Sequence, residues 1–411
     1  MTAPTLATLA ALRDAARAHV AETGFPASRD EDWKYTNVAP IAAVRWGAAP
    51  LEAGSDVAAG PSLSPVRLVF VNGRLVSGLS RIDALPPGVL VENSASASHL
   101  LEHVLARDAT GPTFPALNAA GFEGGAIVRV GPGVRVLDPI ELLFLVVPAR
   151  EPTAAHPRNH VQLDPGASAH VIERHQARGP GLAFTNVVTD VRLGAGARLD
   201  WDQVVDPGDE RFHVGALRVE QGRDSRFVAR SFTMSGRLVR NDVSVHLGAP
   251  GGTCELSGLS LTTGTEHVDN HLAVRHASPA CRSRQLYKGV LDGASRTVFD
   301  GKVVVERDAV KTDARQTNRN LLLSDDATVD TKPNLRIFAD DVKCAHGAAV
   351  GRLDEDALFY LRSRGIDESG ARAVLTFAFA SEVVNGIAHD ALRAEVRGLV
   401  ARRLGFTGGG P

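Results

Sequence analysis

The chain has 411 residues, 44% of them hydrophobic, and a formal net charge of −2 at pH 7. This length allows two or three domains, or one elongated domain with appendages, and the charge gives no general attraction for nucleic acid or for an anionic membrane surface. Three widely separated cysteines (Cys254, Cys281 and Cys344) cannot form a disulfide framework, which predicts a reducing, cytoplasmic location.

The N-terminal segment is typical of an amphipathic helix rather than of a signal peptide. Leu9, Leu12 and Ala16 recur at helical spacing within residues 5–23, and no basic region precedes the apolar stretch. The following "SRDE" predicts a capping box with Ser28 as the N-cap of a further helix. The longest apolar run, "PIELLFLVV", is too short to span a bilayer, and no glycine-rich nucleotide-binding motif is present.

Residues 48–65 are rich in glycine, proline and serine and are predicted to form a loop. Residues 66–76 predict a β-hairpin around Asn72-Gly73, a strong short turn signal. Leucines and valine at positions 100–105 indicate another helix.

From about residue 120, short β-branched runs alternate with tight turns. Taking one residue of each turn as a marker, the spacings are 30, 28, 28 and 28, at Gly166, Gly196, Asp224, Gly252 and Ala280. A fixed period of short strands without intervening helices favours a β-solenoid, whose coils bury their apolar faces by stacking. A large β-sandwich with evenly spaced turns is the alternative.

After residue 350 the pattern becomes helical. Asp354 is a predicted N-cap and Gly365 a predicted helix stop, and further helices are expected over about 369–384 and around 392–404. This three-helix appendage could cover the open end of a solenoid or present a face to a partner. The tail, "TGGGP", is expected to be disordered.

The segment "DDVKCAHGAAVG" places Cys344 two residues before His346, at the junction between the β-rich region and the helices. On an extended strand, positions i and i+2 point to the same side, so the thiol and the imidazole would approach one point. Both are ligands for soft metals, but structural zinc and iron–sulfur clusters normally need about four ligands. From these residues alone, a buried cysteine beside a helix-capping histidine is the favoured interpretation.

Other candidate residues have simpler explanations. His267, His271 and His276 suit a polar ladder on a solenoid face, and residues 156–160 ("HPRNH") are expected in a loop. Cys254 and Cys281 lie about one period apart and are expected in the core. Two acidic pairs could serve a β-helix carbohydrate-active enzyme, but the chain has few aromatic residues to hold sugar rings: Asp200/Asp202 and Asp325/Asp326.

Four stretches together resemble the SufB/SufD family of the SUF iron–sulfur cluster assembly machinery, and the Cys-x-His form is similar to the SufD type. They are "EDWKYTN" at 31–37, "FPALNAAGFEGGAIVRVGPGV" at 114–134, and the longer segments 267–305 and 313–366. The resemblance implies a mostly β protein with a right-handed parallel β-helix core between helical segments. The expected domains are 1–118 (helical and mixed), 119–345 (β-helix) and 346–411 (C-terminal helices).

The resemblance also implies a role. The chain would be a non-enzymatic scaffold that pairs with a SufB-like paralogue and binds a SufC-like ATPase through its C-terminal helices. Cys344 and His346 would help hold a transient iron–sulfur cluster at the shared interface, with no nucleotide on this chain and a flavin possible in the complex. A homodimer is possible in isolation. The residues expected to contact the ATPase are Leu358, Phe359, Tyr360, Phe377 and Phe379.

Two other functions stay open on the sequence. A SufB-type subunit would hold a cluster by itself, with Cys254 or Cys281 as ligands. A β-helix carbohydrate-active enzyme or a zinc hydrolase would show turnover as an isolated chain.

Overall fold

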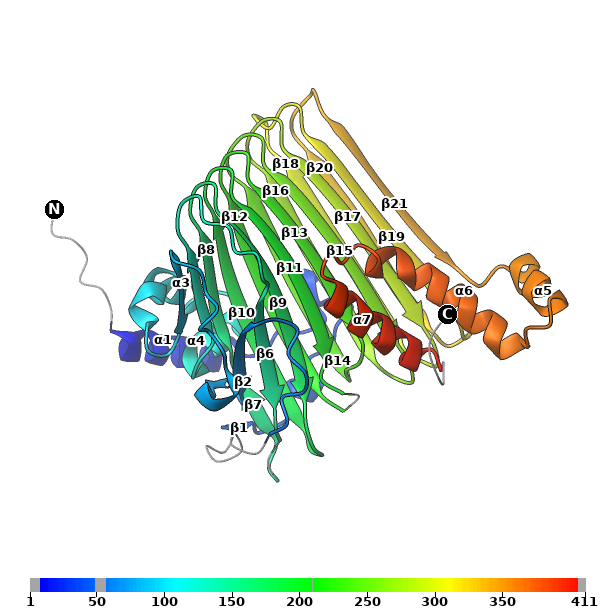
Figure 1. The fold of residues 1–411 in the computed structure, drawn as a ribbon, viewed down its shortest axis with the longest axis horizontal. Helices are drawn as coiled ribbons and strands as arrows, with labels where there is room; N and C mark the ends of the chain where they lie inside the picture. Colours follow the sequence, from blue (N-terminus) through cyan, green and yellow to red (C-terminus); the bar gives the residue numbers. More distant parts are fainter. Residues whose placement is uncertain (1–7, 49–56, 149, 209, 406–411) are drawn as a thin grey trace.

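The fold was obtained as a computed structural model that describes residues 8–48, 57–148, 150–208 and 210–405. Two long sheets face each other along the molecule, and the chain passes from one to the other in successive coils (Figure 1). The expected tail at 407–411 and the first residues of the expected N-terminal helix, 5–7, lie outside the described residues.

The first sheet has the order β20-β18-β16-β14-β12-β10-β8-β5-β4, with β1 and β7 attached at its side. Its strands are parallel except for the β4–β5 pair. Their bounds are β1 (Gly47–Ala48), β4 (Val89–Asn93), β5 (Ala126–Val130), β7 (Thr153–Ala155), β8 (Arg158–Leu163), β10 (Ala183–Leu193), β12 (Phe212–Gln221), β14 (Leu238–Leu247), β16 (His267–His276), β18 (Arg296–Val305) and β20 (Thr328–Ile337).

The second sheet has the order β21-β19-β17-β15-β13-β11-β9-β6-β2-β3. Its strands are parallel except for the β2–β3 hairpin, which turns at Asn72-Gly73 as expected. Their bounds are β2 (Val66–Val71), β3 (Arg74–Leu75), β6 (Ile140–Val146), β9 (Ser168–Ala177), β11 (Arg198–Asp206), β13 (Arg226–Thr233), β15 (Thr253–Thr262), β17 (Arg282–Leu291), β19 (Asp313–Leu322) and β21 (Lys343–Gly351).

These sheets form the predicted parallel β-solenoid, and its turns explain the sequence period. Gly166, Gly196, Asp224 and Ala280 all have positive φ, between 52° and 72°. Each donates its N–H to a carbonyl of the next turn, for example Gly166 to Ala195 at 2.8 Å. One marker is displaced by a residue, since Gly251 and not Gly252 takes the positive φ, 77°. The left-handed conformation recurs because each coil must turn at the same place for the turns to stack.

The core lies between the two sheets. Side chains that face inward form columns along the solenoid, and in one of these Leu199, Phe227, Cys254 and Ser283 are aligned in successive strands. The columns merge into a single apolar cluster that reaches from β2 to β19. Each coil covers the apolar edge of the one before it, and the last coil, which ends the sheets with β20 and β21, has no further described coil beside it.

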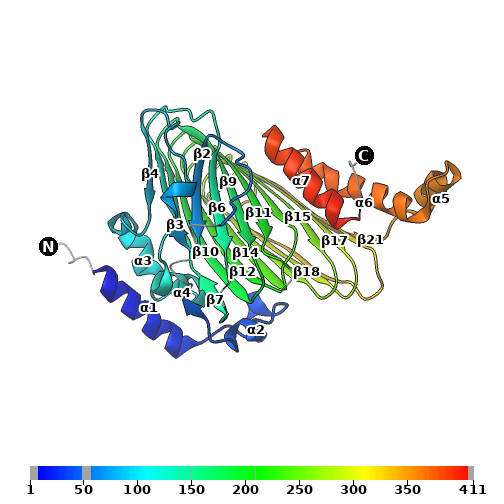
Figure 2. The ribbon, with the colours of Figure 1, turned by 60° about the horizontal axis from the view of Figure 1, so that its bottom comes forward.

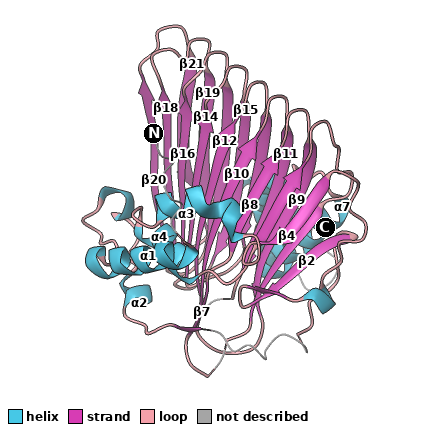
Figure 3. Ribbon diagram, turned by 90° about the vertical axis from the view of Figure 1, so that its left-hand side faces the viewer, coloured by secondary structure: helices cyan, strands magenta, loops and turns pink. Residues whose placement is uncertain are grey.

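The N-terminal helices cover the outer face of the first sheet, where α4 contacts β10 (Figures 2 and 3). They are α1 (Leu9–Thr23), α2 (Ala39–Ala42), α3 (Glu102–Asp108) and α4 (Thr113–Gly121), with short 3₁₀ helices at Glu31–Trp33 and Ser98–Leu101. Another 3₁₀ helix, Ser77–Leu79, contacts β2 of the second sheet. None of the described helices is both long enough and apolar enough to cross a membrane.

Two local expectations in this half are wrong. Ser28 caps no α-helix: the next element is a single 3₁₀ turn after Asp30, and the Asp30 carboxylate accepts from the Ala27 N–H at 2.8 Å. The segment 156–160 is only partly a loop, because residues from Arg158 onward form β8. Here pairing with the neighbouring strands β5 and β10 overrides the local loop signal.

The "EDWKYTN" segment fastens the N-terminal region to the solenoid. The Thr36 hydroxyl donates to the Asp269 carboxylate at 2.6 Å, and the Arg240 guanidinium donates both to that carboxylate and to the Asp32 carbonyl, each at 2.7 Å. The same guanidinium lies 3.8 Å from the centre of the Trp33 ring. This buried ion pair and cation–π contact hold residues 31–37, which we call the latch, against the first sheet.

The C-terminal helices are α5 (Glu355–Ser363), α6 (Glu368–Val384) and α7 (Asp390–Arg403). As expected, the Asp354 side chain caps α5 by accepting from two backbone N–H groups, and Gly365 ends it with a φ of 86°. The helices do not cover the open end of the solenoid. Instead, α6 and α7 lie along the outer face of the second sheet, where their apolar side chains pack with outward-facing residues of β9 to β19 (Figure 1).

Candidate functional site: the open end of the solenoid

The candidate site lies on β21, the last strand of the second sheet. This strand pairs only with β19, so its other edge carries unpaired backbone groups. In the register, Cys344 is opposite Ala314 and His346 is opposite Gln316. Ala314 and Gln316 are both buried inside the solenoid. Because alternate residues of a strand share a face, Cys344 and His346 continue these inward-facing columns at the open end.

Cys344 is half-buried and packs against the core cluster. Burial raises the pKa of its thiol, the nearby Asp313 carboxylate raises it further, and a hydrogen bond with the Ala314 backbone opposes both. The thiol form is therefore favoured in the free subunit. A metal that binds here must displace the proton, because only the thiolate is a strong ligand.

His346 is exposed, and the residue opposite it on β19 is Gln316, which was not a candidate from the sequence. Gln316 lies directly beneath it, and its Nε2 donates to Gln285 Oε1 at 2.8 Å. The Oε1 atom of Gln316 is buried and has no hydrogen-bond partner among the described residues. The buried glutamines Gln285 and Gln316, 31 residues apart, were a possible signal, since stacked amides recur at the solenoid period.

The described residues hold no group of three or more histidine, cysteine or acidic side chains arranged to bind a metal ion. Cys344 and His346 are thus a pair of potential soft ligands on one strand, two positions apart. Such a pair is too small for a closed four-ligand site, so a cluster bound here needs ligands from elsewhere.

Of the three histidines at positions 267, 271 and 276, the first and the last are hydrogen-bonded structural residues, and His271 makes a longer polar contact. The ring Nε2 of His267 lies 3.0 Å from the Thr36 hydroxyl, within the latch. His271 faces the same outer side and approaches the Asp32 carboxylate at 3.8 Å. His276 points into the core, where its Nε2 lies 2.9 Å from the Ser283 hydroxyl. The expected polar ladder on a solenoid face therefore fits the positions of His267 and His271, and it is wrong for His276, which lies inside the core.

The remaining cysteines are core residues, as expected. Cys254 and Cys281 are both fully buried in the main apolar cluster. Burial raises the pKa of each thiol, and the Cys281 thiol donates to the Ala249 carbonyl at 3.3 Å. In this conformation neither sulfur is accessible to a cluster.

The five residues expected at an ATPase contact differ in their exposure. Phe359 and Tyr360 on α5 are 74% and 56% exposed, whereas Leu358 and Phe377 are buried within the subunit. Phe379 is half-buried beneath the ammonium group of a lysine from β17. Of these five residues, only the two α5 aromatics are exposed, and α5 projects away from the body of the molecule (Figures 1 and 2).

The fold is that of a parallel β-solenoid protein, and its last described strand places a cysteine and a histidine on one face. The chain belongs to the SufBD family of the SUF iron–sulfur cluster assembly system. The model of the SufBD core domain matches residues 145–379, and that of the SufBD N-terminal region matches residues 1–142. The family role is the assembly of iron–sulfur clusters.

Similar curated proteins agree with this assignment. The SufD iron–sulfur cluster assembly protein of Escherichia coli is 32% identical over 387 residues, which cover 93% of this chain and 90% of that protein. A SufBD family protein of Synechocystis sp. is 31% identical over 397 residues, covering 92% and 87%. The SufD protein of Bacillus subtilis is 27% identical over 293 residues, covering 70% and 66%.

Proposed function

We propose that this chain is a SufD-type scaffold subunit, in which Cys344 and His346 supply one half of the ligand set for a nascent iron–sulfur cluster. The observation that carries the proposal is their shared inward-facing side on β21, at the uncovered end of the solenoid. Thiolate and imidazole suit iron–sulfur chemistry, and an incomplete set suits a cluster that must later be released.

A SufB-like paralogue supplies the other half in this proposal. The free edge of β21 offers a row of backbone donors and acceptors to a strand of a second chain. Beside it, the last coil exposes Ile337, Phe338 and Val350, which are 42%, 64% and 47% exposed. Apolar side chains next to a free strand edge favour a second polypeptide over solvent. A homodimer would use the same surface when the paralogue is absent.

The C-terminal helices dock a SufC-like ATPase in the same proposal. Phe359 and Tyr360 on α5 are the contact residues, since Leu358 and Phe377 are already buried in the subunit. The helices α6 and α7 pack on the second sheet, whose last strand is β21. A movement of the ATPase would therefore be transmitted to the sheet that carries the ligand pair.

The direct test is co-expression of the chain with SufB-like and SufC-like partners, followed by iron and acid-labile sulfide analysis of the purified complex. We expect His346→Ala and Cys344→Ala to lower cluster content at least severalfold without loss of the partners. The exposed His99 provides a matched control, and His99→Ala should leave cluster content unchanged. Cluster formation should also weaken at low pH, because both ligands must be deprotonated.

Full cluster content in the double variant Cys344→Ala/His346→Ala would overturn the proposal. A cluster held by the isolated chain and lost in Cys254→Ser would instead favour a SufB-type subunit. Substrate turnover by the isolated chain with bound zinc would favour an enzyme. Flavin absorbance of the same purified complex tests whether a flavin accompanies it.

A further inference from the structure

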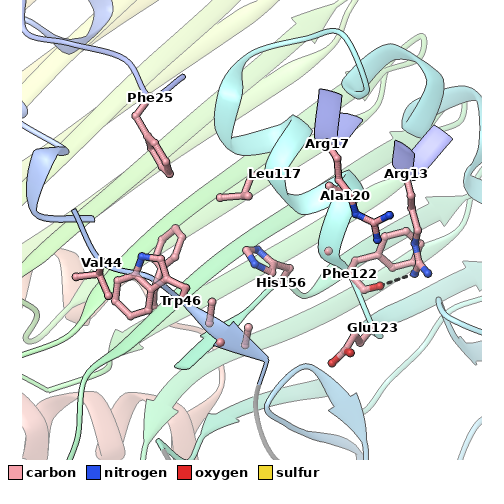
Figure 4. A pocket seen from close by; sticks show the side chains of 15 residues that line it. Arg13, Arg17, Phe25, Val44, Trp46, Leu117, Ala120, Phe122, Glu123 and His156 are labelled. Carbon is pink, nitrogen blue, oxygen red and sulfur yellow. Dashed lines mark hydrogen bonds between the residues drawn. The ribbon is translucent and has the colours of Figure 1, made fainter. Parts of the chain in front are cut away.

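A cavity of about 500 Å³ lies between the N-terminal helices and the solenoid, far along the chain from the ligand pair on β21. Figure 4 shows it as an elongated space, with two arginines of α1 at one end, His156 near the middle and Trp46 at the other end. This volume falls in the range of small-molecule sites, which are mostly apolar with a few placed polar groups.

The cationic end of the cavity offers hydrogen-bond donors. Arg13 donates through one Nη to the Phe122 carbonyl at 2.6 Å, and its guanidinium lies 4.8 Å from the centre of the Phe122 ring. Its Nε is buried and has no partner among the described residues, and no described carboxylate forms an ion pair with it. Among the described residues, the carboxylate that pairs with Arg17 is that of the exposed Asp14 in the same helix. Glu123, at this end, is already paired with Arg74.

His156 adds another donor in the middle of the cavity. The Asn186 amide nitrogen donates to the Phe114 carbonyl at 2.8 Å, which identifies it as the NH₂ group, and it lies 3.4 Å from His156 Nδ1. Nδ1 is therefore the acceptor of the ring, so the proton of the neutral imidazole is on Nε2. Burial lowers the pKa of His156 to about 4, which keeps the ring neutral at pH 7.

The other end of the cavity is aromatic and apolar. The Trp46 indole N–H is occupied by the Ile41 carbonyl at 2.9 Å, so the ring offers its apolar surface. The Trp46 ring lies 5.5 Å from that of Phe184, and Phe25 and Val44 complete the wall. Flat rings stack well on such walls, whereas the polar groups at the opposite end are nearly all donors.

We propose that this cavity binds a small organic anion with a flat aromatic body, such as an aromatic carboxylate or an aryl phosphate or sulfonate. The anionic group would accept hydrogen bonds from Arg13, Arg17 and His156 Nε2. The aromatic body would lie between Trp46 and Leu117. Charge and shape complementarity select this class over cations, which would meet two guanidinium groups, and over neutral polar molecules, which would leave the aromatic wall in water.

The test uses the full chain and the probe 8-anilinonaphthalene-1-sulfonate, an aromatic sulfonate that fluoresces when bound. We expect saturable binding of one probe per chain. The variant Arg13→Gln/Arg17→Gln should raise the dissociation constant of the probe at least tenfold. The variant Leu117→Trp fills the cavity and should abolish that binding. A matched control, Arg198→Gln/Arg223→Gln, removes two exposed arginines that do not line the cavity and should bind as the wild type does.

Two results would overturn the proposal. One is equal probe affinity in the Arg13/Arg17 variant and in its control; the other is unchanged binding in Leu117→Trp. Because a misfolded chain also binds this probe, each variant is first compared with the wild type by circular dichroism and thermal unfolding. The uncharged probe N-phenyl-1-naphthylamine gives a second measurement: it should bind the arginine variant as tightly as the wild type, and a tenfold loss there would contradict the division into anionic and aromatic ends.

Discussion

Histidine 276 shows how a single side chain links this fold to pH. It is fully buried at the end of β16, and burial lowers its pKa from 6.5 to about 4. Burial likewise lowers the pKa of His160, on β8, to about 4. A base whose pKa is lowered by folding binds fewer protons when folded than when unfolded.

We therefore predict that stability falls as the pH is lowered from about 6.5 towards about 4, because the unfolded chain then binds protons that the folded chain excludes. The contribution of His276 is fully present above pH 6.5 and amounts to roughly 3 kcal/mol across that interval. Urea unfolding at pH 7.5, 6 and 5 measures it. His276→Gln cannot titrate and should reduce the slope, whereas the exposed control His99→Gln should leave it unchanged. An unaltered slope in His276→Gln would show that its burial is not linked to pH.

At the scale of elements, a buried lysine joins α6 to the second sheet. Lys288 of β17 is almost fully buried, its Nζ donates to the Phe379 carbonyl at 2.9 Å, and it pairs with Glu382. The ammonium group also lies 4.3 Å from the centre of the Phe379 ring. An outward-facing lysine in a strand is normally exposed, so its burial follows from the docking of the helix.

Lys288→Met keeps the aliphatic stem but removes the charge, and we predict a loss of roughly 1–2 kcal/mol from the ion pair and the cation–π contact. Because the contact joins only α6 to β17, hydrogen exchange should increase in α6 and α7 but not in the coils of the solenoid. Lys302→Met, on the first sheet, is the matched control and should change neither measurement. Equal protection of α6 in both variants would mean that apolar packing alone holds the helix.

At the scale of the whole molecule, the free edge of β21 decides which backbone groups are available to a second chain. The Lys343 N–H donates to Thr312 of the preceding coil. In a parallel strand, successive residues direct their N–H groups alternately to the two sides. The N–H groups of Cys344, His346 and Ala348 therefore point to the free edge of β21, and those of the residues between them point to β19.

This alternation predicts different effects for proline substitutions at two neighbouring positions. Ala348→Pro removes a donor only from the free edge, so it should leave thermal unfolding close to that of the wild type but reduce co-purification of a SufB-like partner. Ala349→Pro removes a hydrogen bond to β19 and should lower the stability itself. Retention of the partner by a folded Ala348→Pro chain would exclude strand pairing across this edge.

Much of the architecture was predictable because its signals are local. The turns at Gly166, Gly196 and Ala280 require a left-handed backbone, and a repeat of such turns indicates stacked coils. The Asp354 cap and the Gly365 stop likewise depend on residues within one helical turn. The expected domain boundaries at 118 and 345 have no such local marker: strands of the two sheets occur before residue 119, from β1 at Gly47 onward, and continue through β21 to Gly351.

The amino-acid sequence by itself determined the coil period, the hairpin, the helix caps and the pairing of a thiol with an imidazole on one face of a strand. Only the tertiary structure decided that this face lies at an uncovered end, that α6 and α7 pack on the flank and not over that end, and that Thr36 reaches Asp269 across 233 residues. The physical reason is range. Backbone conformation is set by neighbouring residues, whereas burial and partnership depend on which distant surfaces the finished coils bring together.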